Sequence, residues 1–121
     1  MQGSVSLTVR SAASGRSRHS TLRRMSGSSL RDRLTVGQSV VMPGVWDALS
    51  ARLAAGARFR TVFLNGYCVS GTLLGLPDFG YLTQTEMAEV ARRVCSAVPG
   101  TMVVVDADTG YGNPLNAMRT V

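Results

Sequence analysis

The chain has 121 residues, enough for one domain, and a formal net charge of +6. It contains no lysine, which excludes Schiff-base, P-loop and kinase mechanisms that need one, and its two cysteines and single histidine give neither zinc-binding spacing nor a disulfide framework. No apolar run approaches the ~20 residues that span a bilayer, so no membrane partner is expected.

Residues 1–30 differ in composition from the rest of the chain. They hold five arginines and no acidic residue, whereas residues 31–121 hold eight arginines against seven acidic residues. This Ser- and Arg-rich tail has too few large apolar side chains to fold, and we predict that it is disordered.

Three interpretations of the tail are open. Residues 1–24 are typical of an organelle transit peptide for a chloroplast or mitochondrion. They are also consistent with a translated leader before a true start at Met25, which would leave a cytoplasmic protein. The third is a tether for RNA or an anionic membrane. In residues 31–121 the basic residues do not cluster with aromatic residues, so we expect no nucleic-acid partner.

The first predicted elements lie between residues 39 and 64. Ser39–Met42 is a short apolar run that Pro43-Gly44 closes, which indicates a buried strand and a turn. A helix follows, with Asp47 in its first turn and an end near Gly56. Its apolar residues recur at helical spacing: Trp46, Leu49, Leu53 and Ala57. Residues 61–64 form the second predicted strand.

The second half begins with a glycine-containing loop from residue 65. Thr83 to Glu86 is a capping box that predicts the start of a helix, and Pro99-Gly100 ends it. One stripe of that helix is apolar: Met87, Val90, Ala91, Val94, Cys95 and Val98. A third strand is predicted at residues 101–105, and Asn113-Pro114 supplies the cap and first residue of a third helix.

The resulting order, β-α-β-α-β-α, indicates an α/β fold with a parallel sheet covered by helices. In such folds the site lies at the carboxyl ends of the strands. Three strands leave parallel edges unpaired, and a complete (β/α)₈ barrel needs roughly 200–250 residues. We therefore predict that residues 31–121 are the N-terminal part of a (β/α)₈ TIM barrel, about three βα units, preceded by the disordered tail.

The segment from Asp106 to Asn113 is the strongest functional signal. Two carboxylates, Asp106 and Asp108, follow a buried strand, and side chains at i and i+2 of a strand point the same way. Like charges held together are costly unless a cation or hydrogen-bond donors share them, and Mg²⁺ takes oxygen ligands. The alternative is an ordinary solvated Asp-rich turn.

Several stretches together resemble one known family. These are Pro43–Leu53, Asn65–Ser70, Leu73–Gly80 with Leu82-Thr83, and Asp106–Asn113 with Asn116 and Arg119–Val121. In this order and spacing they resemble the isocitrate lyase/phosphoenolpyruvate mutase superfamily. Within it they are most similar to the carboxyvinyl-carboxyphosphonate phosphorylmutase-like branch, with methylisocitrate lyases and oxaloacetate decarboxylases as close relatives.

The resemblance implies a Mg²⁺-dependent C–C lyase or phosphonomutase acting on 2-oxo or 2-hydroxy carboxylates through a metal-stabilised enolate, with Mn²⁺ as a substitute ion. It implies that Asp106 binds the ion directly and Asp108 directly or through water. Asp78 matches an active-site carboxylate and is the implied catalytic residue, plausibly an outer-shell metal partner. The implied substrate-binding residues are Trp46, Asn65, Gly66 and Tyr67. The partner would be a small carboxylate or phosphonate, and the full-length protein would form a homo-oligomer.

The sequence departs from the family pattern in two ways. Asn65 stands where the family often has Ser, which affects substrate choice. The loop that supplies the family's Cys or Lys acid/base, and a Glu and an Arg, would lie beyond Val121. We therefore expect little or no activity from this polypeptide alone. The alternative function is a catalytically incompetent truncated barrel that acts as an interaction partner of a full-length relative.

The remaining motifs favour structural roles. Asp78-Phe79-Gly80 matches the kinase metal motif, but no lysine or Gly-rich loop accompanies it. Cys68 is either a loop nucleophile or a small apolar residue packed behind the loop, and we favour the second. Cys95 is predicted to be structural, and Arg92 and Arg93 to form a solvated helix face.

Overall fold

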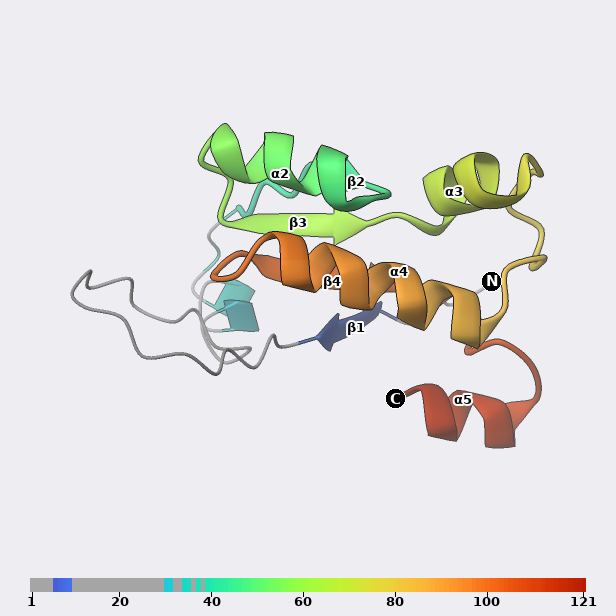
Figure 1. Ribbon diagram of the computed structural model, residues 1–121. Helices are drawn as coiled ribbons and strands as arrows, with labels where there is room; N and C mark the ends of the chain where they lie inside the picture. The colour runs from blue at the N-terminus through green and yellow to red at the C-terminus, as the bar shows by residue number, and fades with distance from the viewer. Residues whose placement is uncertain (1–5, 10–29, 32–33, 36, 38) are drawn as a thin grey trace.

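The computed structural model describes residues 6–9, 30–31, 34–35, 37 and 39–121 (Figure 1). The strands are β1 (Ser6–Val9), β2 (Gly44–Val45), β3 (Thr61–Leu64) and β4 (Met102–Asp106). The α-helices are α2 (Ala48–Gly56), α3 (Gly66–Val69), α4 (Gln84–Ala97) and α5 (Pro114–Thr120), and a π-helix, η1 (Ser70–Leu74), continues α3. No helix in these ranges combines the length and the apolar character needed to cross a membrane.

The strands form one sheet in the order β1-β4-β3-β2. Strands β2, β3 and β4 are parallel, with Val45 opposite Leu64 and Leu64 opposite Val105. Strand β1 pairs antiparallel with the outer edge of β4. The three parallel strands therefore end together at one edge of the sheet, and the loops that follow β3 and β4 meet there.

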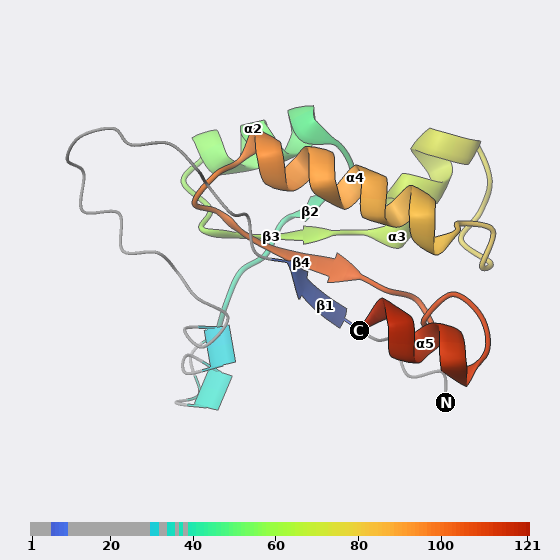
Figure 2. The same cartoon turned by 60° about the horizontal axis from the view of Figure 1, so that its bottom comes forward.

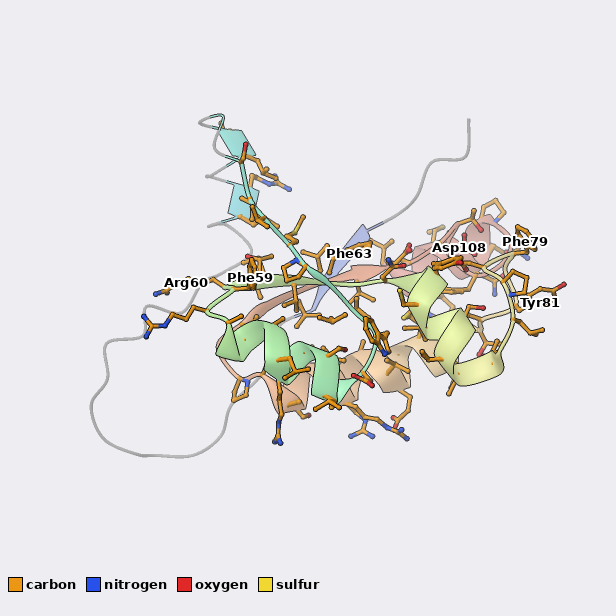
Figure 3. The ribbon with its side chains drawn as sticks, turned by 90° about the horizontal axis from the view of Figure 1, so that it is seen from above. Phe59, Arg60, Phe63, Phe79, Tyr81 and Asp108 are labelled. Carbon is orange, nitrogen blue, oxygen red and sulfur yellow. The ribbon has the colours of Figure 1, made fainter. Side chains whose placement is uncertain are left out.

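Helices α2 and α4 cover one face of this sheet (Figure 2). Alternate strand residues face them, and four of these belong to the buried core: Val62, Leu64, Val103 and Val105. The intervening Phe63 and Val104 are not part of this core, and strand alternation directs them to the other face (Figure 3 labels Phe63). By the same alternation, Asp106 shares the face of Val104, away from the helices.

Several predicted elements are confirmed. Strand β3 has the predicted bounds, and β4 is shifted by one residue. Thr83 and Glu86 form the predicted capping box at the start of α4, and the predicted stripe of α4 is buried or packs against the core. The Asn113 side chain caps α5, and Pro114 is its first residue. Arg92 and Arg93 are exposed and pair with Glu89, as expected of a solvated face.

The predicted strand at Ser39–Met42 is wrong in position, because pairing begins later, at the Pro43 carbonyl, which accepts the Phe63 N–H at 3.0 Å. Gly44 lies opposite Phe63, so residues 39–41 would extend past the start of β3 and have no partner there. The apolar run therefore leads into the strand instead of forming it, and Val41 is exposed.

The apolar stripe proposed for the first helix is also not the buried one. Leu49 and Leu53 are 66% and 67% exposed, whereas Ala51 and Ala54 are buried against the core. Small side chains on the inner face let α2 approach the sheet and α4 closely. Asp47 precedes the helix as its N-cap, accepting the Ser50 N–H at 2.7 Å, and does not lie within the first turn.

Two features were not predicted from the sequence. Residues 66–74 form α3 and η1 where a loop was expected. Strand β1 lies within the segment predicted to be disordered, so that prediction does not hold for Ser6–Val9. Residues 1–5 and 10–29 of the tail, including His19 and Met25, lie outside the described residues.

We predict that Leu64→Ala lowers the free energy of unfolding by about 3 kcal/mol, because Leu64 is fully buried between the sheet and its helices. Leu53→Ala is the matched control, and its exposed side chain should cost no more than about 0.5 kcal/mol. Urea denaturation followed by circular dichroism measures both, and equal losses would contradict the assigned core.

Candidate functional site

The loops at the carboxyl edge of the sheet bring polar groups together. Helix α3 begins one residue after β3 ends, and the loop after β4 leads to α5, so both lie beyond the strand ends (Figure 2). Asp108, Phe79 and Tyr81 lie at this end, whereas Phe59 and Arg60 lie at the opposite end of the sheet (Figure 3).

Gly66 is the point on which two of the carboxylates converge. A methyl group placed on Gly66 would lie 3.1 Å from Oδ2 of Asp106 and 3.6 Å from Oδ2 of Asp78. The Gly66 N–H also donates a long hydrogen bond of 3.4 Å to Asp106 Oδ2. Asp78 comes from the loop before α4 and Asp106 from the end of β4, so the fold itself brings these carboxylates together around a residue without a side chain.

Asp108 joins this cluster by a turn and not by strand alternation. Strand β4 ends at Asp106, and Asp108 has a left-handed φ of 47°. Its N–H donates to Asp106 Oδ1 at 3.1 Å. A methyl group on Gly80 would lie 3.9 Å from Asp108 Oδ2, which places this carboxylate beside the loop that carries Asp78.

The electrostatics reflect this crowding. Partial desolvation of its carboxyl group, followed by the charges of Asp106 and Asp108, raises the pKa of Asp78 above its ordinary value of 3.8. The folded chain therefore holds the Asp78 proton more tightly than the unfolded chain. This contribution lowers the free energy of unfolding as the pH rises above 3.8, until Asp78 is ionised in both states. A bound cation would oppose the effect.

The carboxylates do not form a complete metal cage. Within the described part of the chain, no group of three or more His, Cys, Asp or Glu side chains has the geometry to hold a metal ion. Mg²⁺ commonly uses one or two protein carboxylates and completes its octahedron with waters and substrate oxygens. The donor set, which consists of carboxylate oxygens, fits that ion chemically.

A pocket of about 470 Å³ lies beside α3 and η1. Three of its lining residues are Trp46, Tyr67 and Cys68; the others are Gly71, Thr72, Gly75, Leu76 and Pro77. The three aspartates do not line it. The predicted site residues thus fall into two groups, the aspartates and the pocket residues Trp46 and Tyr67. Cys68 is half-buried at the pocket wall. Cys95 is buried on α4, in agreement with a structural role.

The backbone donors predicted for a substrate carboxylate have partners within the chain. Asn65 caps α3, and its Oδ1 accepts the Tyr67 N–H at 2.9 Å, while the Gly66 N–H points to Asp106. Asn65 therefore organises the start of α3, and a substrate carboxylate at these amides would compete with the Asn65 and Asp106 side chains.

Two polar residues of this region were not predicted from the sequence. The Tyr111 phenol donates to the Asp106 carbonyl at 3.1 Å, and the Thr120 hydroxyl donates to the Gly110 carbonyl at 3.0 Å. The alternation of Gly110 and Gly112 around Tyr111 was the available signal, because such spacing is typical of a backbone with positive φ.

Comparison with known proteins identifies the family. The family model described as phosphoenolpyruvate phosphomutase matches residues 30–121. The chain belongs to this family. All the predicted site residues, from Trp46 to Asp108, lie within the matched range.

Named relatives agree. The petal death protein of Dianthus caryophyllus is 54% identical over 83 residues, 69% of this chain and 26% of that protein. The chloroplastic carboxyvinyl-carboxyphosphonate phosphorylmutase of Arabidopsis thaliana is 52% identical over 82 residues, 68% of this chain and 24% of that protein. The 2,3-dimethylmalate lyase of Eubacterium barkeri is 44% identical over 92 residues, 76% of this chain and 32% of that protein. The chain thus spans about a quarter to a third of these relatives.

Solved structures support the same assignment. A 2,3-dimethylmalate lyase of the PEP mutase/isocitrate lyase superfamily has a TM-score of 0.69 at 39% identity, over 77% of this chain and 33% of that chain. An oxaloacetate acetylhydrolase has a TM-score of 0.69 at 33% identity, over 78% of this chain and 34% of that chain. The predicted superfamily and the predicted fold, the N-terminal part of its barrel, are therefore confirmed. The relatives named include a lyase and a phosphorylmutase.

We predict that Gly110→Ala lowers the free energy of unfolding by about 3 kcal/mol. Its φ of 93° is unfavourable for alanine, and the new methyl group would lie 2.5 Å from Ala117 Cβ. Gly100→Ala is the control, because Gly100 has the same type of φ, 95°, and open space around it. Gly100→Ala should lower the free energy of unfolding by only about 1 kcal/mol. Equal costs in thermal or urea unfolding would show that the loop does not pack against α5.

Proposed function

We propose that this chain carries the metal-binding and part of the substrate-binding edge of a Mg²⁺-dependent C–C lyase or phosphonomutase that acts on 2-oxo or 2-hydroxy carboxylates. The observation that supports the proposal is the convergence of Asp78 and Asp106 on Gly66, within a segment that belongs to the family. Two carboxylates from separate loops around a bare backbone are a poor arrangement for stability alone.

The metal role follows from the donor set. Asp106 would hold the ion directly, and Asp108, whose N–H is bonded to the Asp106 side chain, would hold it directly or through water. Asp78 would act from outside this pair, accepting hydrogen bonds from metal-bound water. Mn²⁺ has similar oxygen-ligand preferences and would substitute for Mg²⁺. When bound, the ion would stabilise negative charge that develops on a substrate enolate oxygen.

The substrate role rests on α3 and the adjoining pocket. The Gly66 and Tyr67 amides would receive a substrate carboxylate, since the glycine permits close approach, and Asn65 would move its side-chain oxygen aside. Trp46 and Tyr67 line the pocket and would contact the remainder of the substrate. The group that donates or accepts the proton would come from a segment other than these residues.

A second candidate function is a non-catalytic subunit that associates with a longer member of the family. Apolar side chains exposed on two helices support it: Leu49 and Leu53 on α2, and Leu115 and Met118 on α5. Such a subunit has no need to bind Mg²⁺. Measuring the affinity for Mg²⁺ therefore separates the two candidates.

The transit-peptide interpretation of residues 1–24 also remains a proposal. The Arabidopsis relative is named as chloroplastic, which supports an organelle location over a translated leader. Strand β1 lies inside this segment and pairs with β4, so removal of the segment would expose the outer edge of β4.

We expect the 121-residue chain to bind Mg²⁺ and Asp106→Asn to weaken binding at least about ten-fold, since it removes a charged ligand while keeping its shape. Asp47→Asn is the matched control. Asp47 caps α2 away from the cluster, and asparagine caps a helix equally well. Isothermal titration calorimetry measures the affinities. The proposal fails if the unmodified chain does not bind, or if Asp106→Asn binds as tightly as Asp47→Asn.

A further inference from the structure

The loop between β4 and α5 is closed by hydrogen bonds within a few residues. The Gly110 N–H donates to the Ala107 carbonyl at 2.8 Å, and the Tyr111 phenol donates back to the Asp106 carbonyl at 3.1 Å. The second bond joins the Tyr111 side chain, at the centre of the loop, to the backbone of Asp106. The phenol therefore fixes the end of β4 from across the loop.

The loop adopts this shape against the preference of its backbone. Asp108 and Tyr111 have φ values of 47° and 61°, in the left-handed region that costs a residue with a side chain roughly 1–2 kcal/mol. Non-glycine residues in this region persist only where the surroundings hold them, and they cluster at functional sites. Here the interactions of the Tyr111 side chain are a candidate for what holds Asp108 and Tyr111 in this conformation.

Tyr111 is suited to a fixed donor role. Its ring is half-buried and packs against the core, which holds the side chain in place. A phenol keeps its proton at neutral pH, so the hydroxyl can donate to the Asp106 carbonyl.

The far side of the loop is fastened to α5. The Thr120 hydroxyl lies 3.0 Å from the Gly110 carbonyl and 3.1 Å from the Asn116 carbonyl, so it joins the loop to the last turn of the helix. Gly110 approaches Ala117 too closely for any side chain at position 110. The loop is therefore joined to α5 by a hydrogen bond and by close packing.

We propose that Tyr111, with Thr120, is a positioning residue that fixes the loop so that the Asp106 and Asp108 carboxylates are held together before a cation arrives. This inference rests on the proposed function for its purpose, but the fixed loop is testable without any metal. Neither residue touches the cation or the substrate in this account. Tyr111 acts through the backbone of Asp106, and Thr120 acts through the backbone of Gly110.

Amide hydrogen exchange of the metal-free chain, followed by NMR, tests the fixed loop. Tyr111→Phe keeps the ring and removes only the hydroxyl, so the Gly110 amide should exchange about ten-fold faster. The Val98 amide, bonded to the Val94 carbonyl at the end of α4, should be unchanged. Tyr81→Phe is the control, because the Tyr81 phenol makes no hydrogen bond to another described residue, and it should leave both rates unchanged.

Thr120→Val provides a second variant, with Thr72→Val as its control. Both threonines bond to a carbonyl four residues earlier, but only Thr120 also reaches the loop. Faster exchange at Gly110 in Thr120→Val alone is expected. Equal acceleration at Gly110 and Val98 in the Tyr111 and Thr120 variants, or no acceleration in either, would overturn the inference.

A Mg²⁺ titration then separates the two proposals. If the unmodified chain binds Mg²⁺, Tyr111→Phe should bind roughly ten-fold more weakly, a loss typical of groups that orient metal ligands. Equal affinities would overturn the positioning role and leave the metal site intact. Absence of binding by the unmodified chain would refute the proposed function, whereas the exchange experiment would still decide whether the loop is fixed by Tyr111.

Discussion

The repulsion between carboxylates gathered at one edge of the sheet is the constraint on which the rest of this site depends. Parallel strands end at the same edge, so Asp106, the last residue of β4, lies next to Gly66, which follows β3. Asp78 arrives from the loop before α4, and partial burial, followed by the charges of Asp106 and Asp108, raises its pKa. An arrangement that is unfavourable in the isolated chain becomes favourable when a cation shares the charges.

Rigidity of the surrounding backbone makes this arrangement possible. Free loops would let like charges separate into water. Here the Gly110 contact with Ala117 and the Thr120 hydrogen bond keep the loop against α5, while Tyr111 ties it to the end of β4. Asp108 and Tyr111, both with positive φ, belong to this same loop. Strain and charge repulsion are thus concentrated at the same few residues.

Sequence patterns predicted the elements whose signals are local. The apolar run of β3, the capping box at Thr83 and the Asn113-Pro114 helix start each depend on neighbouring residues, and all three are confirmed. The same local reasoning placed Asp106 and Asp108 in one cluster, although the turn, and not strand alternation, accounts for Asp108.

Features that depend on distant partners could not be predicted in this way. Which face of α2 is buried is set by how closely the helix approaches the sheet and α4, which favours Ala51 and Ala54 over the larger Leu49 and Leu53. The start of β2 is set by where β3 begins. Likewise, the role of Tyr111 becomes visible only once the loop has folded back on β4.

Paramagnetic broadening by Mn²⁺ tests most directly whether a cation sits between these carboxylates. With substoichiometric Mn²⁺ added to the full chain, the amide resonances of Gly66 and Asp108 should broaden first, because they flank the cluster. The amide of Phe59, at the opposite end of the sheet, should stay sharp (Figure 3). Broadening that is uniform, or that centres on Glu89 while Gly66 remains sharp, would contradict the account.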